Sequence, residues 1–145
     1  MADFWYTPAK QKLAKADLDF DTVDLRARLC MSNTTADTDQ DAANITAIGT
    51  LDEYDGAGYT ALDLATVAIT EDDPNNRSEI SYASGTWGAT VSAGTRNIVG
   101  ILYYVRVDGT NGNDYPVAWK DVTPFNGNGG AINFTPNAEG VLQIT

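Results

Sequence analysis

Alternation of apolar and charged residues marks the first clear element of the chain. Between residues 23 and 30 it reads Val23-Asp24-Leu25-Arg26 and continues in the same manner. A period of two is typical of a strand with one buried and one exposed face. We therefore expect a strand in this segment, with Cys30 on its charged face.

The most hydrophobic run extends from Ile98 to Val107 and predicts a central strand that is covered on both faces. Gly100 within it indicates a bulge or the close approach of a neighbouring side chain. Asp108-Gly109 and Asn111-Gly112 follow, and such residues tolerate the positive φ of tight turns. Because the segment from Tyr115 to Trp119 is again apolar and aromatic, we expect a hairpin here.

Shorter apolar runs, separated by turn residues, complete the pattern. The runs lie at 62–69, 80–82, 86–92, 131–134 and 141–144, and the turns or loops at 33–44, 71–76, 84–85, 125–130 and 137–140. Turn signals at intervals of about 8 to 12 residues are typical of antiparallel sandwiches and barrels. We predict an all-β fold of roughly seven or eight strands, either an antiparallel β-sandwich or a jelly-roll-like barrel.

The first 16 residues form a candidate partner-binding arm, while residues 17–145 form a single β domain. The arm carries the aromatic residues Phe4, Trp5 and Tyr6 and the basic residues Lys10, Lys12 and Lys15. Thr7 as a cap and Pro8 in the first turn predict a short helix through Ala16, so the arm is extended or short-helical. It either packs on its own domain or anchors on a neighbouring subunit, and the sequence leaves both open.

Composition narrows the functional classes. The 145 residues include 20 acidic and 9 basic ones, one cysteine and no histidine, which gives a net charge of −11. An internal disulfide is excluded, and the common zinc sites and the usual general base are missing. The acidic balance opposes binding to nucleic acid, and no apolar run is long enough for a membrane helix. We predict a non-enzymatic cytosolic product without a cofactor, a metal, a nucleic-acid partner or a membrane partner.

Three groups of residues resemble functional sites but have simpler interpretations. Asp37-Thr38-Asp39-Gln40-Asp41 begins like a calcium loop, yet Ala42 and Ile48 replace the required glycine and glutamate, which favours a solvated acidic loop. Asp52, Glu53 and Asp55 have the residue types of a glycosidase pair, yet Gly56-Ala57-Gly58 follows at once and favours a turn. Trp5, Trp87 and Trp119 are candidates for a sugar-stacking platform, although packing between sheets is the commoner use.

One stretch resembles a known family. Residues 51–62, which read LDEYDGAGYTAL, and the later Trp87 are similar to the E-x-x-G-x-G-Y-T and downstream Trp pattern of small virion proteins of tailed bacteriophages. The flanking segments 9–29 and 139–142 are also similar, whereas Ser84-Gly85-Thr86 lacks the acidic step usual before the tryptophan. The matching residues are Glu53, Gly56, Gly58, Tyr59 and Trp87. A positive φ at Gly58 and backbone N–H bonds to Glu53 are expected if they hold a structural turn.

The resemblance implies a structural virion protein, made in the host cytoplasm and placed on the outer capsid surface as a decoration or cement protein. Its partners are then the major capsid protein and itself, as a homotrimer. The acidic domain would be repelled by a packaged genome, and the basic arm would reach the capsid or a neighbouring protomer. The alternatives are another virion subunit (tail, head-fibre or adaptor protein) and a carbohydrate-binding β-sandwich module.

Overall fold

The computed structural model describes residues 3–65 and 68–144. In these residues, short strands make up most of the regular structure, with one α-helix and two short 3-10 helices. The elements in chain order are β1 (Phe4–Trp5), α1 (Thr7–Ala14), β2 (Leu25–Met31), η1 (Ile45–Ala47), β3 (Leu62–Asp63), β4 (Ala68–Asp72), η2 (Asp73–Asn75), β5 (Arg77–Ser81), β6 (Gly85–Gly88), β7 (Ile98–Val105), β8 (Tyr115–Phe125), β9 (Ile132–Phe134) and β10 (Leu142–Ile144).

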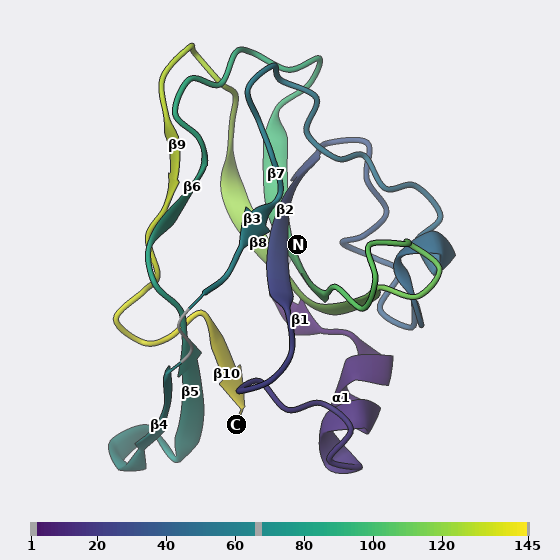
Figure 1. Cartoon of the computed structure of the whole chain (residues 1–145), viewed down its shortest axis with the longest axis vertical. Helices are drawn as coiled ribbons and strands as arrows, with labels where there is room; N and C mark the ends of the chain where they lie inside the picture. The colour runs from purple at the N-terminus through teal and green to yellow at the C-terminus, as the bar shows by residue number, and fades with distance from the viewer. Residues whose placement is uncertain (1–2, 66–67, 145) are drawn as a thin grey trace.

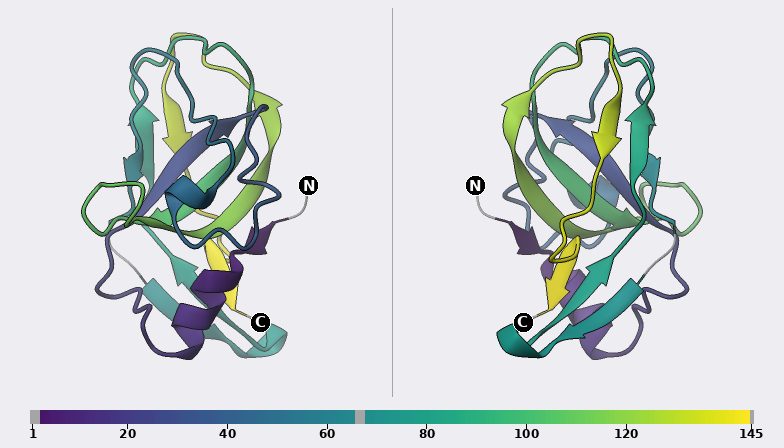
Figure 2. Two further views of the ribbon diagram at one scale, coloured as in Figure 1. Left: turned by 90° about the vertical axis from the view of Figure 1, so that its right-hand side faces the viewer. Right: turned by 90° about the vertical axis from the view of Figure 1, so that its left-hand side faces the viewer.

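A five-stranded antiparallel sheet, in the order β1-β8-β7-β2-β3, forms the middle layer. The sheets β6-β9 and β10-β5-β4 lie on one side of it, while the loop after β2 lies on the other (Figure 1). The predicted all-β, sandwich-like fold is confirmed, whereas none of the sheets of the described residues closes into a barrel. Figure 2 shows that α1 and the β4–β5 hairpin lie at the same end of the molecule.

The central hairpin of β7 and β8 is confirmed, with shifted ends. β7 stops at Val105, and Val107 is 59% exposed, because the chain turns earlier than the apolar run suggests. Both expectations for Gly100 hold: the pairing with β8 shifts register there, and a Cβ would lie 1.9 Å from Cζ2 of Trp119. The indole of Trp119 therefore packs directly on the glycine backbone.

The strand predicted from alternation is confirmed as β2, and Cys30 lies on its charged face as predicted, but this end of the face is not exposed. Cys30 shares a face with Arg26 and Arg28, yet it is fully buried. Thr34 of the loop after β2 and Tyr6 of the arm lie close to the Cys30 thiol at this end of the face. Burial also raises the pKa of the Cys30 thiol, so the cysteine is an inert part of the core.

Two shorter predictions need correction. Gly85 does not form a turn with Ser84 but opens β6, which ends at Gly88 rather than continuing to residue 92. Val91 is nevertheless fully buried, because its backbone bonds to the loop at 129–130 and its side chain enters the core from outside a strand. Part of the run at 62–69, including Val67, lies outside the described residues.

The arm packs on its own domain. Phe4 pairs with Trp119 through β1 and β8, and Tyr6 is fully buried. The amide of Tyr6 donates to the Val117 carbonyl at 2.9 Å, and its hydroxyl donates to the Ala36 carbonyl. The arm is thus joined to the central sheet, while its lysine side chains remain outside the core.

The helix of the arm starts differently from the prediction. Tyr6 occupies the N-cap position, no side chain caps the helix, and α1 ends at Ala14 rather than Ala16. Thr7 does not act as the cap because its own amide lies in the first turn, where it donates to the Gln40 carbonyl at 2.8 Å. Ala16 has a φ of 58°, which ends the helical path.

Removing residues 1–16 is expected to abolish cooperative folding, because the deletion takes away an edge strand and a large buried aromatic ring. Tyr6→Ala alone should lower the free energy of unfolding by about 3 to 5 kcal/mol, as for other large buried aromatic residues. Lys15→Ala, at an exposed position, should change it by less than about 0.5 kcal/mol. Urea unfolding followed by circular dichroism measures all three; a cooperative truncated protein would contradict this account.

Candidate functional site

The motif residues singled out in the sequence are Glu53, Gly56, Gly58, Tyr59 and Trp87. They come together at the edge of β2. Glu53 bridges to Cys30, and the Tyr59 hydroxyl donates to the Glu53 carboxylate at 3.0 Å. The same hydroxyl accepts the Leu29 amide at 3.1 Å, and burial raises the pKa of Tyr59. Glu53 therefore receives the tyrosine hydroxyl rather than the backbone N–H groups that were expected.

Glycines allow the motif to lie against the segment after β6. Gly58 has the predicted positive φ, 88°, and a Cβ there would lie 2.1 Å from the Thr90 carbonyl oxygen. At Gly56 a Cβ would lie 2.3 Å from the Ser92 carbonyl oxygen, and at Gly88 it would lie 2.2 Å from that of Gly58. Two stretches of backbone are thus in direct contact, which only residues without a side chain permit.

Trp87 completes this junction from the opposite sheet. Its indole N–H donates to the Ala27 carbonyl of β2 at 3.1 Å, and its own carbonyl accepts the Thr60 amide at 2.8 Å. The ring is 3% exposed and packs edge-on against Phe134. Tyr59 and Trp87 thus bond to the backbone of β2, and the arrangement holds the turn and β6 against this strand.

The carboxylates beside the motif are occupied by structural contacts. Asp52 binds the Arg96 guanidinium, with a 2.9 Å contact to Nε, and accepts the Asn33 amide. Asp55 accepts the amide and the hydroxyl of Thr95, each at 2.8 Å. These bonds lower the pKa of both aspartates, whereas a general acid needs a raised pKa.

The acidic segment 37–41 is a loop held by its own backbone. The Asp39 carboxylate accepts the Thr35 hydroxyl at 2.6 Å and the Gly49 amide at 2.8 Å. These bonds use the Asp39 carboxylate to join the two ends of the loop.

Among the described residues, one acidic cluster has ligand-like spacing: Asp72, Glu79 and Glu139. Arg77 lies among these three side chains and forms ion pairs with all of them, including contacts of 2.9 Å to Asp72 and 2.8 Å to Glu79. Its guanidinium supplies the positive charge that the carboxylates need. We therefore assign a structural role, fixing the β4–β5 hairpin, and no metal.

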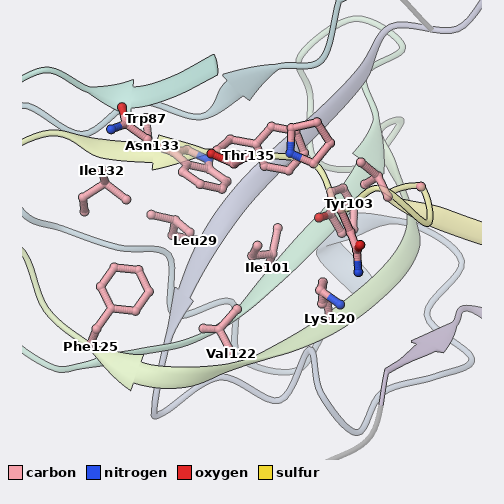
Figure 3. Close-up of a pocket in the computed structure, with 15 residues that line it drawn as sticks. Leu29, Trp87, Ile101, Tyr103, Lys120, Val122, Phe125, Ile132, Asn133 and Thr135 are labelled. Carbon is pink, nitrogen blue, oxygen red and sulfur yellow. The ribbon is translucent and has the colours of Figure 1, made fainter. Parts of the chain in front are cut away.

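An apolar seam separates the central sheet from β9 (Figure 3). Leu29, Ile101 and Val122 from the sheet face Trp87 and Ile132 across it. Its volume is about 250 Å³, which is below the roughly 300 to 1,000 Å³ of typical ligand pockets. The lysine at its mouth, Lys120, is already paired with Asp3 at 3.0 Å. The seam is therefore a gap between sheets rather than a convincing ligand site.

A larger depression, here named the terminal groove, lies between α1 and β10 and has a volume of about 600 Å³. Its lining consists of Asp3, Phe4, Trp5, Lys10, Leu13, Ala14, Gln143 and Ile144. The indole N–H of Trp5 donates to the Gln143 carbonyl at 3.0 Å and joins the two walls. Arm residues that the sequence singled out therefore line an apolar surface with a lysine at its side.

The three tryptophans do not form a sugar-stacking platform. Trp87 and Trp119 are 3% and 1% exposed, and Trp5 is half-buried in the terminal groove. Sequence reasoning missed the groove, because Gln143 and Ile144 join the arm only through tertiary packing.

Comparisons with family models, curated proteins and solved structures find no match for this chain. In the part of the chain that the structure describes, no helix has the length and apolar character to span a membrane.

Gly58→Ala should lower the free energy of unfolding by about 2 to 4 kcal/mol, because it combines a positive φ with a backbone clash. Gly129→Ala is the matched control, since Gly129 also has a φ of 88° but nothing lies within 4 Å of its Cβ position. Only the conformational cost of about 1 kcal/mol applies there. Equal losses in urea unfolding would show that the contact with Thr90 is not tight.

Asp52 should make stability depend on acid. Because Arg96 lowers its folded-state pKa, the carboxylate stabilises the fold above its unfolded-state pKa of about 4, and this contribution is lost as the pH falls through the lower value. Asp52→Asn should therefore flatten the fall in unfolding free energy below about pH 4. Asp41→Asn, at an exposed position without a hydrogen bond among the described residues, should leave the profile unchanged.

Proposed function

We propose that this protein is a structural component of a tailed-bacteriophage virion, and that it decorates the outer capsid surface. Its role would be to stabilise the shell by binding the major capsid protein and other copies of itself. The protein would act by contact, not by catalysis. This proposal follows the resemblance of the motif and is supported by the distribution of charge and apolar surface.

The observation that carries the proposal is the unpaired basic charge beside the terminal groove. Lys10 lines the groove, and Lys15 follows Ala14 of its lining. Both lysines are exposed and form no ion pair among the described residues. They stand out in a protein with a net charge of −11. Partly exposed apolar residues next to unpaired charge are typical of a protein contact surface.

The acidic charge of the rest of the molecule supports a position on the outside of a capsid. A packaged genome is a dense array of phosphates, and like charges repel over a distance of about 8 Å at physiological salt. The inner surface of a filled capsid would therefore disfavour this protein. An outer position avoids the repulsion and leaves the basic arm free to bind.

The motif supports a structural role as well. Glu53, Tyr59 and Trp87 use their polar atoms to join the turn, β2 and β6. If the motif stabilises the fold, proteins that share the motif are expected to share the fold as well. Substitutions there are expected to act through stability and not through a reaction.

A second candidate, a tail, head-fibre or adaptor subunit, would use the same contact surface. The carbohydrate-binding alternative is less well supported, because Trp87 and Trp119 are buried. A glycan ligand would have to bind without them.

The position of the protein on the particle tests the proposal. Virions that contain the protein and virions from a deletion mutant would be compared by electron microscopy and by heat disruption. Decoration predicts extra density on the outer shell faces and a higher disruption temperature when the protein is present. Density at the tail or neck would favour the second candidate, and absence of the protein from purified virions would contradict both.

A further inference from the structure

We propose that the terminal groove binds the β4–β5 hairpin of a second copy of this chain. The inference goes beyond the proposed function and can be tested on the isolated protein. It rests on an apolar groove with unpaired lysines, an exposed acidic hairpin, and the position of both at one end of the molecule (Figure 2).

The groove is an incomplete part of the core. Phe4, Trp5 and Leu13 are only half-buried along it, and Ile144 is 36% exposed at its other wall. Its volume of about 600 Å³ lies in the range that accommodates several side chains. A partner that fills it would bury apolar surface that this chain leaves in contact with water.

The hairpin has the complementary properties. Residues 68–71 of β4 are exposed, and β4 is an edge strand that pairs only with β5. Ile69 is 48% exposed and offers an apolar side chain to a groove. Glu71 and Asp73 are exposed and have no basic partner among the described residues, so their charge is available to lysines.

The hairpin is also held in one shape. Arg77 pairs with carboxylates of both strands and of the 139 turn, and Asn76 adopts a φ of 50° at the tip. A fixed hairpin loses little conformational entropy when it binds. Pre-organisation of this kind favours its use as the inserted element.

A chain cannot place this hairpin in its own groove. Ile144 pairs with Ser78 of β5, and Ser78 pairs with Glu71 of β4. β5 therefore separates β4 from β10, and the strand spacing keeps the two about 10 Å apart. Neither Ile69 nor Glu71 lines the groove of its own chain, and in the proposed contact a second molecule supplies them.

The position of both elements at one end allows a closed pair. A two-fold axis near that end would carry each hairpin to the other groove, so that every contact is made twice. Lys10 and Lys15 of one copy would then face Glu71 and Asp73 of the other. We infer a dimer as the basic unit in solution.

Charge reversal tests this pairing with internal controls. Groove variant Lys10→Glu/Lys15→Glu and hairpin variant Glu71→Lys/Asp73→Lys should each raise the dimer dissociation constant at least tenfold by sedimentation equilibrium. An equimolar mixture of the two should restore dimers, because both contacts in a mixed dimer pair opposite charges. A chain with all four substitutions should also dimerise. Asp41→Lys, at an exposed position that lines neither the groove nor the hairpin, should have no effect.

Ile69→Ser provides a second, uncharged test and should raise the dissociation constant at least tenfold. Circular dichroism checks that each variant is folded. Dimer formation in the equimolar mixture of the charge-reversal variants is an independent check, because only folded chains can form it. A wild-type protein that stays monomeric up to millimolar concentration would overturn the inference, and so would an oligomer that none of the reversals weakens. Because no capsid is present, these outcomes are separate from failure of the proposed decoration function.

Discussion

The fold depends on close backbone contact at one end of the sandwich, where the turn at 53–60 lies against the segment after β6. Gly56, Gly58 and Gly88 permit that contact, since a Cβ at each would meet a carbonyl oxygen within 2.3 Å. The Tyr54 hydroxyl reinforces it by accepting the amides of Gly94 and Gly127 at 2.8 and 2.9 Å. With a single cysteine, the chain has no internal disulfide to join these loops. Backbone contact and one buried hydroxyl do so instead.

The opposite end of the molecule is built differently. There α1 and β10 flank the terminal groove and leave apolar side chains partly exposed. The β4–β5 hairpin lies at the same end, on the other side of β10 (Figure 1). Sheet β10-β5-β4 is narrow, so Ile80 is buried while Ile69, directly across from it on the edge strand, is 48% exposed. One end of the sandwich is closed by backbone contacts, whereas the other leaves apolar side chains exposed. We therefore expect a partner to bind at the exposed end. That asymmetry underlies the placement of the partner surface.

Local patterns in the sequence predicted the features that depend on neighbouring residues. Alternation located β2, the apolar run located β7, and glycine chemistry located the positive φ at Gly58. Alternation predicted the face on which Cys30 lies but not its burial, because tertiary packing, not the pattern within the strand, decides whether that face meets water. The terminal groove was unpredictable for the same reason: Trp5 and Gln143 meet although they are 138 residues apart.

The same reasoning changes the meaning of the charge segregation in the sequence. A basic, aromatic segment before an acidic domain resembles a detachable arm, yet Tyr6 is fully buried and β1 belongs to the central sheet. The aromatic residues therefore serve the fold first, and only the groove side of Phe4 and Trp5 remains for a partner. Among the lysines of the arm, Lys12 contacts its own domain, with its Nζ 4.7 Å from the ring centre of Tyr115. Lys10 and Lys15 form no ion pair among the described residues. Burial thus divides the arm into residues that stabilise the fold and residues that can contact a partner. A partner that binds this end must therefore match both a small apolar surface and the charge of Lys10 and Lys15.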